Sequence, residues 1–285
     1  MGYLRRHPRA VPYLLIAPGL AWLAVLFVVP LYYLVTTSLQ SGDIYEGFRL
    51  TWQWSNYGEM LSQYRPQLVR SALYAAIATV AALLIAYPIV YFIARRGGQW
   101  KSLLLVLLVA PFFVTYLIRT IAWQTILADE GLVVGVLRDV HILAPDGRLL
   151  ATSFAVVAGI TYNYFPFMAL PLYVALEQLD GRLLEASSDL YANSVRSFLR
   201  VTLPISLPGV FAGTLTTFIP AMGDFVNAQL LGTPKQYMIG NVIQSKFLVI
   251  VDYPLASAGA VILMVLILVG VAIYARALGA ERLTG

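Results

Sequence analysis

Two ionisable residues lie deep within long apolar stretches of this sequence. Arg119 follows "PFFVTYLI", and Asp224 follows "FIPAMG". A charged side chain inside a membrane span usually pairs with an opposite charge or faces a cavity. The residue types therefore allow two interpretations. Arg119 and Asp224 form a structural ion pair, or the Asp224 carboxylate lines a path for a cation.

The helical spacing around Asp224 extends the second interpretation. Thr217, Pro220 and Asn227 stand three, four or seven residues from Asp224. Residues three and four apart are neighbours on one face of a helix. If the helix is continuous through this stretch, these side chains share the face of the carboxylate.

The stretch "TYNYFPFMALP" adds aromatic and amide groups near the middle of another apolar run. Tyr162, Asn163 and Tyr164 have the chemistry to hold an alkyl-ammonium chain by cation–π contact and hydrogen bonding. The alternative is that these aromatic rings pack between helices. We assign the candidate path to Asp224, Asn227, Tyr162, Asn163, Arg119 and Tyr116.

A charged segment at 177–203 separates two apolar runs. Its apolar residues recur at spacings close to three and four, which predicts an amphipathic helix with Glu185 and Asp189 on the wet side. A surface loop, a helix lying on lipid and a lipid-binding basic patch are alternatives. An interfacial helix has a strongly basic polar face, whereas this segment mixes acids and arginines, which suits a groove on another protein better.

The elements that must position these residues follow from composition. The chain has 285 residues, 60% hydrophobic and 12% charged, where a soluble domain has about 25% charged residues. A membrane span needs roughly 20 apolar residues. We therefore predict an all-α polytopic membrane protein with one transmembrane domain, 1–285, and a retained first span. The predicted spans are 11–39, 68–94, 102–128, 149–176, 205–231 and 254–276.

The basic residues predict the orientation, because cytoplasmic loops carry an excess of Lys and Arg. One side holds Arg5, Arg6, Arg9, Arg95, Arg96, Lys101, Arg182, Arg196, Arg200, Arg276 and Arg282. The opposite side holds Arg49, Arg65, Arg138, Arg148, Lys235 and Lys246. We expect both termini and the 177–203 segment in the cytoplasm. The excess of basic residues is thus explained by the membrane topology and does not indicate a nucleic-acid partner.

Several classes of chemistry lack the residues they need. The chain has no cysteine, its histidines His7 and His141 lie outside the spans, and no G-x-x-x-x-G-K-[ST] motif occurs. We expect no metal site, no ATP site and no enzymatic activity in this chain. A membrane enzyme would need clustered carboxylates or histidines at the interface. A secondary carrier often shows an inverted repeat, and we find neither.

The stretch "EASSDLYANSVRSFLRVTLPISLPG" resembles the EAA loop of ABC-transporter importer permeases. The positions that match are Glu185, Ala186, Asp189, Ala192, Phe198, Val201, Leu203, Pro204, Pro208 and Gly209. Ser187 replaces the usual second alanine, and Tyr191 occupies the usual glycine position. A left-handed backbone is costly for tyrosine, so we expect the turn to shift to Asn193. The resemblance implies a coupling helix that contacts an ATPase through Glu185, Ala186, Ser187, Asp189, Leu190, Tyr191, Ala192, Phe198 and Pro204.

Two further stretches, "PFFVTYLIRTIAWQTILADEGLV" and "FIPAMGDFVNAQLLGTPKQYMIGNVIQSKFL", look like spermidine/putrescine-type permeases. The resemblance runs from about residue 65 onward. It implies a bacterial inner-membrane type I importer permease, most similar to those for polyamines. Ferric iron, opine, phosphonate or thiosulfate remain alternative solutes. The implied partners are an ABC ATPase dimer that binds ATP and Mg, a homologous but non-identical second permease, and a substrate-binding protein.

Overall fold

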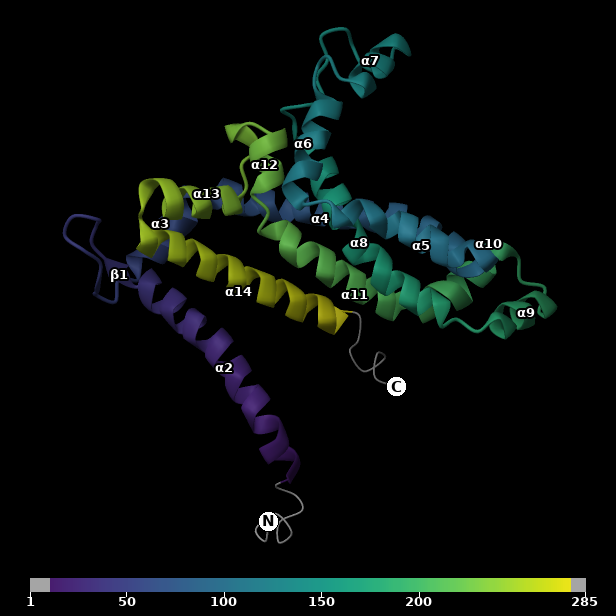
Figure 1. Ribbon diagram of the computed structural model, residues 1–285, viewed down its shortest axis with the longest axis horizontal. Coiled ribbons are helices and arrows are strands. Elements are labelled where there is room, and N and C mark those ends of the chain that lie inside the picture. The colour runs from purple at the N-terminus through teal and green to yellow at the C-terminus, as the bar shows by residue number, and fades with distance from the viewer. Residues whose placement is uncertain (1–10, 278–285) are drawn as a thin grey trace. The chain divides into compact units, whose positions relative to one another are not determined.

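The computed structural model describes residues 11–277, and the backbone in this range is mostly helical (Figure 1). Five residues used in the sequence-based predictions lie outside the described residues: Arg5, Arg6, His7, Arg9 and Arg282. The described residues divide into two compact units. The larger comprises Tyr64–Gln244 and the residues from Val265 onward, and the smaller comprises the residues up to Gln63 together with Ser245–Met264.

The larger unit contains most of the helices. In chain order they are α4 (Arg65–Arg96), η1 (Gly98–Trp100), α5 (Lys101–Val109), η2 (Ala110–Phe113), α6 (Tyr116–Leu127), α7 (Leu132–Asp139), α8 (Ser153–Glu177), α9 (Gly181–Asp189), α10 (Ser194–Ser197), η3 (Phe198–Thr202), α11 (Leu203–Met222), α12 (Val226–Leu231) and η4 (Pro234–Gln236). Helices α13 (Ile239–Ser245) and α14 (Tyr253–Ala277) each have residues in both units.

The smaller unit contains α2 (Val11–Ser38), β1 (Gln40–Ser41), β2 (Arg49–Leu50), α3 (Ser55–Gln63) and η5 (Lys246–Ile250). The two short strands pair antiparallel, with Gln40 opposite Leu50. The Asn56 side-chain amide on α3 donates hydrogen bonds to the carbonyl oxygens of Ser38 and Gln40, at 2.9 and 3.0 Å. These bonds hold α3 against the junction of α2 and β1.

Helices α4, α8 and α11 form the core of the larger unit. The buried contact is formed by Ala82, Ala86 and Val90 of α4 and by Met168, Ala169, Leu172 and Leu176 of α8. On α11, a Cβ atom at Gly209 would lie 2.5 Å from the Cβ of Ala175, and one at Gly213 would lie 2.8 Å from the sulfur of Met168. Glycines spaced four residues apart therefore let α11 approach α8 closely.

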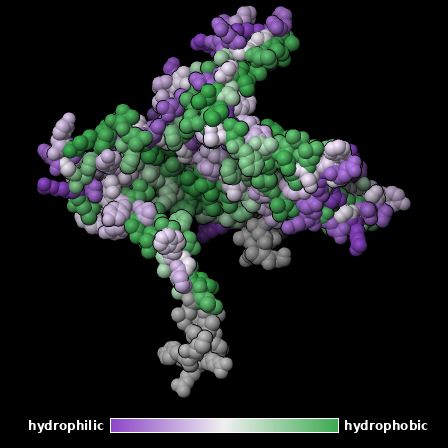
Figure 2. All heavy atoms as spheres, viewed as in Figure 1, coloured by the Kyte–Doolittle hydropathy of each residue, from purple (hydrophilic) through white to green (hydrophobic). Residues whose placement is uncertain are grey.

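Six helical stretches among the described residues are long and apolar enough to cross a membrane: Leu15–Ser38, Arg65–Arg96, Tyr116–Asp139, Ser153–Glu177, Ser194–Met222 and Tyr253–Arg276. The all-helical, six-span prediction is confirmed, and the chain is a multi-pass membrane protein. Figure 2 shows hydrophobic residues along the packed helices and hydrophilic ones gathered over the α9 end of the larger unit.

Two spans expected to be continuous helices are interrupted in the structure. Within 102–128, Val114 and Thr115 are extended, with ψ of 141° and 144°, and separate η2 from α6. Pro111, just before, has no N–H with which to continue the helical ladder. Within 205–231, α11 ends at Met222 and α12 begins at Val226. Both interruptions lie beside the ionisable residues singled out in the sequence.

Candidate functional site

Asp224 lies in the interruption between α11 and α12 and is only 4% exposed. Its Oδ2 accepts hydrogen bonds from the hydroxyls of Tyr116 and Tyr164, the second at 3.1 Å, and from the side-chain amide of Asn227 at 3.0 Å. Its Oδ1 accepts from the Asn227 backbone N–H at 2.9 Å. The carboxylate is thus buried and held by neutral donors from α6, α8 and α12.

A second layer of polar groups supports these donors. The Asn163 amide on α8 donates to Asn227 Oδ1 at 3.1 Å and to the Thr120 hydroxyl at 3.0 Å. The Asn227 amide also donates to the Tyr116 hydroxyl at 2.5 Å. Thr120, Asn163 and Asn227 are all buried. We call Tyr116, Thr120, Asn163, Tyr164, Asp224 and Asn227 together the Asp224 cluster.

The local sequence explains why the chain can bring these residues together. By accepting the Asn227 N–H, the Asp224 side chain caps the first turn of α12, as Asp commonly does where helices begin. Close packing requires glycine at two neighbouring positions. A Cβ atom at Gly159 would lie 2.6 Å from Asn227 Oδ1, and one at Gly240 would lie 2.5 Å from the Gly223 carbonyl oxygen. Glycine therefore lets α8 and α13 approach the interrupted segment.

The expected helical face through Asp224 is wrong, because α11 ends two residues before it. Thr217 is buried on α11, but its hydroxyl makes no hydrogen bond and does not join the cluster. Asn227 does join it, through the cap of α12. Of the stretch 162–164, Asn163 and Tyr164 contribute to the cluster, and Tyr162 does not.

Arg119 does not form an ion pair with Asp224. Among residues 11–277 the ion pairs are Lys101–Glu177, Arg148–Asp129 and Lys246–Asp252. The Arg119 guanidinium instead lies 4.5 Å from the ring centre of Phe112, and 5.9 and 6.0 Å from those of Tyr162 and Tyr116. Such cation–π contacts contribute about 0.5–2 kcal/mol each. Tyr116 therefore stands between the two charges, with its ring toward Arg119 and its hydroxyl toward Asp224.

Tyr162 belongs to an aromatic group beside the cluster. Its ring lies 5.6 Å from that of Phe112 and 5.5 Å from that of Trp123, centre to centre. The same three rings form part of the wall of an apolar cavity of about 1110 Å³. Further residues of α4, α5 and α8, together with Pro111 of η2, contribute the rest of the wall. The structure thus divides the predicted path residues between a polar cluster at Asp224 and an aromatic group at Arg119.

A second candidate region is the α9–α10 segment, residues 178–202. Helix α9 is amphipathic as expected, with Glu185 and Asp189 exposed. Of the residues assigned to ATPase contact, most are exposed: Glu185, Ala186, Asp189, Leu190, Tyr191 and Pro204. Ser187 is buried instead and hydrogen-bonds to the Ser197 hydroxyl at 2.7 Å. Phe198, the first residue of η3, packs edge-to-face on Tyr87, with ring centres 5.4 Å apart, and so fixes η3 to α4.

The turn between α9 and α10 differs from the expectation. Tyr191 itself adopts the left-handed conformation, with φ of 58°, and Asn193 has φ of −72° and caps α10 by accepting the Arg196 N–H at 2.8 Å. Left-handed backbone costs a non-glycine residue roughly 1–2 kcal/mol. The expected shift of the turn to Asn193 is therefore wrong, because the asparagine is engaged as a cap.

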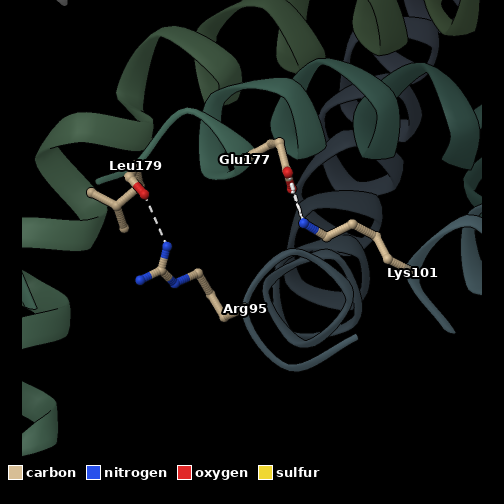
Figure 3. A network of polar contacts seen from close by, with 4 residues as sticks. All are labelled: Arg95, Lys101, Glu177 and Leu179. Carbon is tan, nitrogen blue, oxygen red and sulfur yellow. Dashed lines mark hydrogen bonds and ion pairs between the residues drawn. The ribbon is translucent and has the colours of Figure 1, made fainter. Parts of the chain in front are cut away.

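Basic side chains from α4 and α5 hold the point where α8 leads into α9 (Figure 3). Lys101, the first residue of α5, forms an ion pair of 2.6 Å with Glu177, the last residue of α8. Arg95, near the end of α4, donates to the carbonyl oxygen of Leu179 at 2.9 Å. These two contacts attach the end of α8 and the start of the α9–α10 segment to the last turn of α4 and the first residue of α5.

Sequence reasoning missed several of these residues. Thr120 was not singled out, although it stands four residues after Tyr116 and so shares its helix face. Tyr164 was noted but not assigned to the path. The Lys101–Glu177 pair joins residues 76 apart in the chain. No local pattern signals such a contact.

No protein-family model matches the chain. The sequence is 38% identical over 260 residues to the spermidine/putrescine transport system permease protein PotB of Haemophilus influenzae, covering 90% of each chain. It is 34% identical over 257 residues to PotB of Escherichia coli, covering 90% of this chain and 94% of that one. It is also 32% identical over 225 residues to the inner membrane ABC transporter permease protein YdcU of Escherichia coli, covering 75% of this chain and 71% of the other.

Solved structures show the same fold. A chain of a bacterial ABC transporter involved in the import of the acidic polysaccharide alginate superposes with a TM-score of 0.70 at 16% identity, and the match covers 100% of both chains. The same TM-score applies to an alginate transporter in complex with an alginate pentasaccharide-bound periplasmic protein, with 99% of each chain covered.

Proposed function

The chain belongs to the family of spermidine/putrescine transport permeases and related ABC transporter permeases, and from this we propose that it is the membrane subunit of an ATP-driven polyamine importer. The observation that carries the proposal is the similarity to two PotB permeases over 90% of the chain. Polyamines are flexible cations, and a carboxylate among aromatic hydroxyls suits an ammonium group.

The energy for transport comes from other chains in this proposal. The sequence contains no phosphate-binding loop motif, so ATP and Mg bind to a separate ATPase dimer. A second, homologous permease completes the path, and a substrate-binding protein delivers the polyamine. The membrane is the bacterial inner membrane, with both termini and the α9–α10 segment on the cytoplasmic side. The exposed arginines of that segment, Arg182, Arg196 and Arg200, agree with this orientation.

We assign the α9–α10 segment to the ATPase contact. Its exposed face mixes acids, arginines and apolar side chains, and its inner face is attached to α4 through Phe198. A surface that is firmly attached to the membrane helices on one side and open on the other can pass a movement of the ATPase to those helices. The transport step involves no covalent chemistry on the substrate.

We assign Asp224 to the polyamine path. Its carboxylate accepts four hydrogen bonds from neutral groups, and no cationic side chain within residues 11–277 lies in ion-pair contact with it. Burying a carboxylate without a counter-charge is costly. An ammonium group of the substrate, arriving when the cluster opens, would supply the missing positive charge.

The test is uptake of labelled spermidine and putrescine by cells that express this chain with its ATPase, second permease and binding protein. We expect saturable, ATP-dependent uptake, which Asp224→Asn lowers at least about tenfold, since a charged hydrogen-bonded interaction contributes roughly 1.5–3 kcal/mol. Asp146→Asn is the matched control, because Asp146 is exposed in the loop after α7. Uptake of a different solute and none of polyamine would contradict the substrate assignment.

A further inference from the structure

Three aromatic rings from three different elements lie close to the Arg119 guanidinium. Its central carbon, Cζ, is 4.5 Å from the ring centre of Phe112 in η2, 5.9 Å from that of Tyr162 in α8 and 6.0 Å from that of Tyr116 in α6. We call Phe112, Tyr116 and Tyr162 the aromatic cage. Groups of aromatic rings bind ammonium and guanidinium cations through their faces. The cage therefore already contains a cation, and that cation belongs to the chain itself.

The Arg119 guanidinium has donors that the chain does not use. Its Nε and Nη1 atoms are buried, and neither has a hydrogen-bond partner within residues 11–277. None of the ion pairs in that range involves Arg119. By contrast, the guanidinium of Arg138 donates to the carbonyl oxygens of Asp129 and Gly147. A cation buried without such partners is costly, and in a membrane span it usually marks a functional position.

The aromatic cage borders the apolar cavity of about 1110 Å³. Phe112 and Tyr162 form part of the cavity wall, and none of the described residues that line it is charged. Such a wall suits methylene groups, because apolar groups gain free energy when they leave water for an apolar surface. A flexible aliphatic molecule in the cavity therefore reaches two rings of the cage.

Tyr116 joins the aromatic cage to Asp224. Its ring belongs to the cage, and its hydroxyl donates a hydrogen bond to Asp224 Oδ2. The carboxylate and the cage are therefore one tyrosine side chain apart. A polyamine has two or more ammonium groups separated by methylene chains. A molecule with one ammonium group at Asp224 can thus place another in the cage and its methylene groups in the cavity.

We propose that the aromatic cage is a second cation subsite of the polyamine path, and that Arg119 is an internal competitor that occupies it until an ammonium group of the substrate takes its place. This inference rests on the proposed function and adds a second point of recognition to it. Replacement of one cation by another conserves the charge in the cage. The return of Arg119 then displaces the ammonium group and favours release of the substrate. Arg119 can move because its side chain is long and α6 begins just after the extended residues Val114 and Thr115.

The experiment measures equilibrium binding of radiolabelled spermidine to the complex of the permease pair and the ATPase in lipid nanodiscs, without the binding protein. Arg119→Gln removes the competitor, and we expect spermidine to bind about tenfold more tightly. Tighter binding slows release, so uptake falls although the affinity rises. Arg138→Gln is the matched control, because Arg138 is half-buried like Arg119 but bonds to the segment around α7. We expect it to leave spermidine binding unchanged.

A second pair of variants tests the aromatic cage itself. In the Arg119→Gln background, Tyr162→Leu removes one ring, and we expect it to weaken spermidine binding about fivefold. Tyr162→Phe keeps the ring and should stay within about twofold of the Arg119→Gln protein. A purely electrostatic effect of the lost positive charge would not depend on the ring at position 162.

The outcomes separate this inference from the function on which it rests. Equal spermidine affinity of the unmodified protein and Arg119→Gln, or of the Tyr162→Leu and Tyr162→Phe variants, overturns the inference and leaves the importer proposal standing. A complex that transports neither spermidine nor putrescine contradicts the proposed function itself. Spermidine with a photoreactive terminal group tests the unmodified protein and does not require Arg119→Gln to fold. Adducts at Phe112 or Tyr162 support the subsite, and adducts only at other residues overturn it.

Discussion

The polar groups of the Asp224 cluster form hydrogen bonds with one another in the interior of the larger unit. The outer face of the α9–α10 segment is instead exposed. Asp224 accepts hydrogen bonds from three helices and is almost completely buried. The Tyr191 side chain is exposed, and its backbone is in the left-handed conformation, which glycine adopts more easily. The two regions therefore differ in their contacts: the Asp224 side chain is stabilised by hydrogen bonds within the chain, whereas the Tyr191 side chain is exposed.

This difference indicates how each region works in the proposed importer. A buried carboxylate with neutral partners is a pre-formed place for a cation, and opening it requires movement of α6, α8 or α12. The exposed face of the α9–α10 segment is, in that proposal, the surface that contacts the ATPase. Along α8, Tyr164 of the cluster stands 13 residues before Glu177, which corresponds to about 20 Å. Helix α8 thus spans the distance between the two regions.

The largest expected effect concerns the separation of Arg119 from Asp224. We expect Asp224→Asn and Arg119→Gln each to lower polyamine uptake, and the double variant to be no better than Asp224→Asn alone. The reason is that Arg119 is held by aromatic rings and not by the carboxylate. Uptake is measured at matched amounts of protein in the membrane. Recovery of uptake in the double variant would reveal a functional ion pair and exclude the substrate role of Asp224.

An intermediate effect is expected from the packing that forms the cluster. Gly159→Ala places a methyl group against Leu231 and Asn227, and overpacking a buried site costs roughly 1–3 kcal/mol. We expect a lower midpoint of thermal unfolding in detergent, together with reduced uptake. Gly135→Ala is the control, because its Cβ meets no atom within 4 Å and alanine favours the α7 helix. Equal unfolding midpoints for the two variants would show that α8 and α12 are not tightly packed.

The smallest expected effect concerns the attachment of the α9–α10 segment at Lys101 and Glu177. Exposed ion pairs contribute only about 0.2–1 kcal/mol, so Lys101→Glu or Glu177→Lys should lower the ratio of uptake to ATP hydrolysis only a few-fold. Exchanging both charges should recover at least half of the loss. In the control, Arg148→Glu breaks the other exposed ion pair of the larger unit, with Asp129, and should leave the ratio unchanged. Single variants that match the unmodified protein would show that the contact has no part in coupling.

The architecture was largely predictable from sequence. Runs of apolar residues predicted six spans because a backbone in hydrocarbon must satisfy its own hydrogen bonds as a helix, and residues 11–277 contain six such helical stretches. The motif around Glu185 predicted the importer permease family, which the relatives confirm. Asp224 and Asn227 were selected as neighbours, and they do lie in contact.

The composition of the cluster was only partly predictable. Tyr116 and Asp224 are 108 residues apart in the chain, and Tyr164 and Asp224 are 60 apart. These residues come into contact because α11 ends before Asp224 and α6 begins at Tyr116. A prediction from helix periodicity assumes that each helix continues through such a stretch, so it does not reveal these contacts. The expected helical face with Thr217 fails for this reason. The turn at Tyr191 was also misjudged: the Asn193 side chain caps α10, and Tyr191 is the residue that adopts the left-handed conformation after α9.

The sequence by itself determined that this chain crosses the membrane as helices, because apolar length and hydrogen bonding leave no other arrangement. It also determined the family and the presence of one buried carboxylate in an apolar stretch. Only the tertiary structure decided that Asp224 is held by tyrosines and asparagines while Arg119 stacks on Phe112. The physical reason is that a buried charge takes whichever partners the packed helices bring within hydrogen-bond distance, and helix interruptions set that distance.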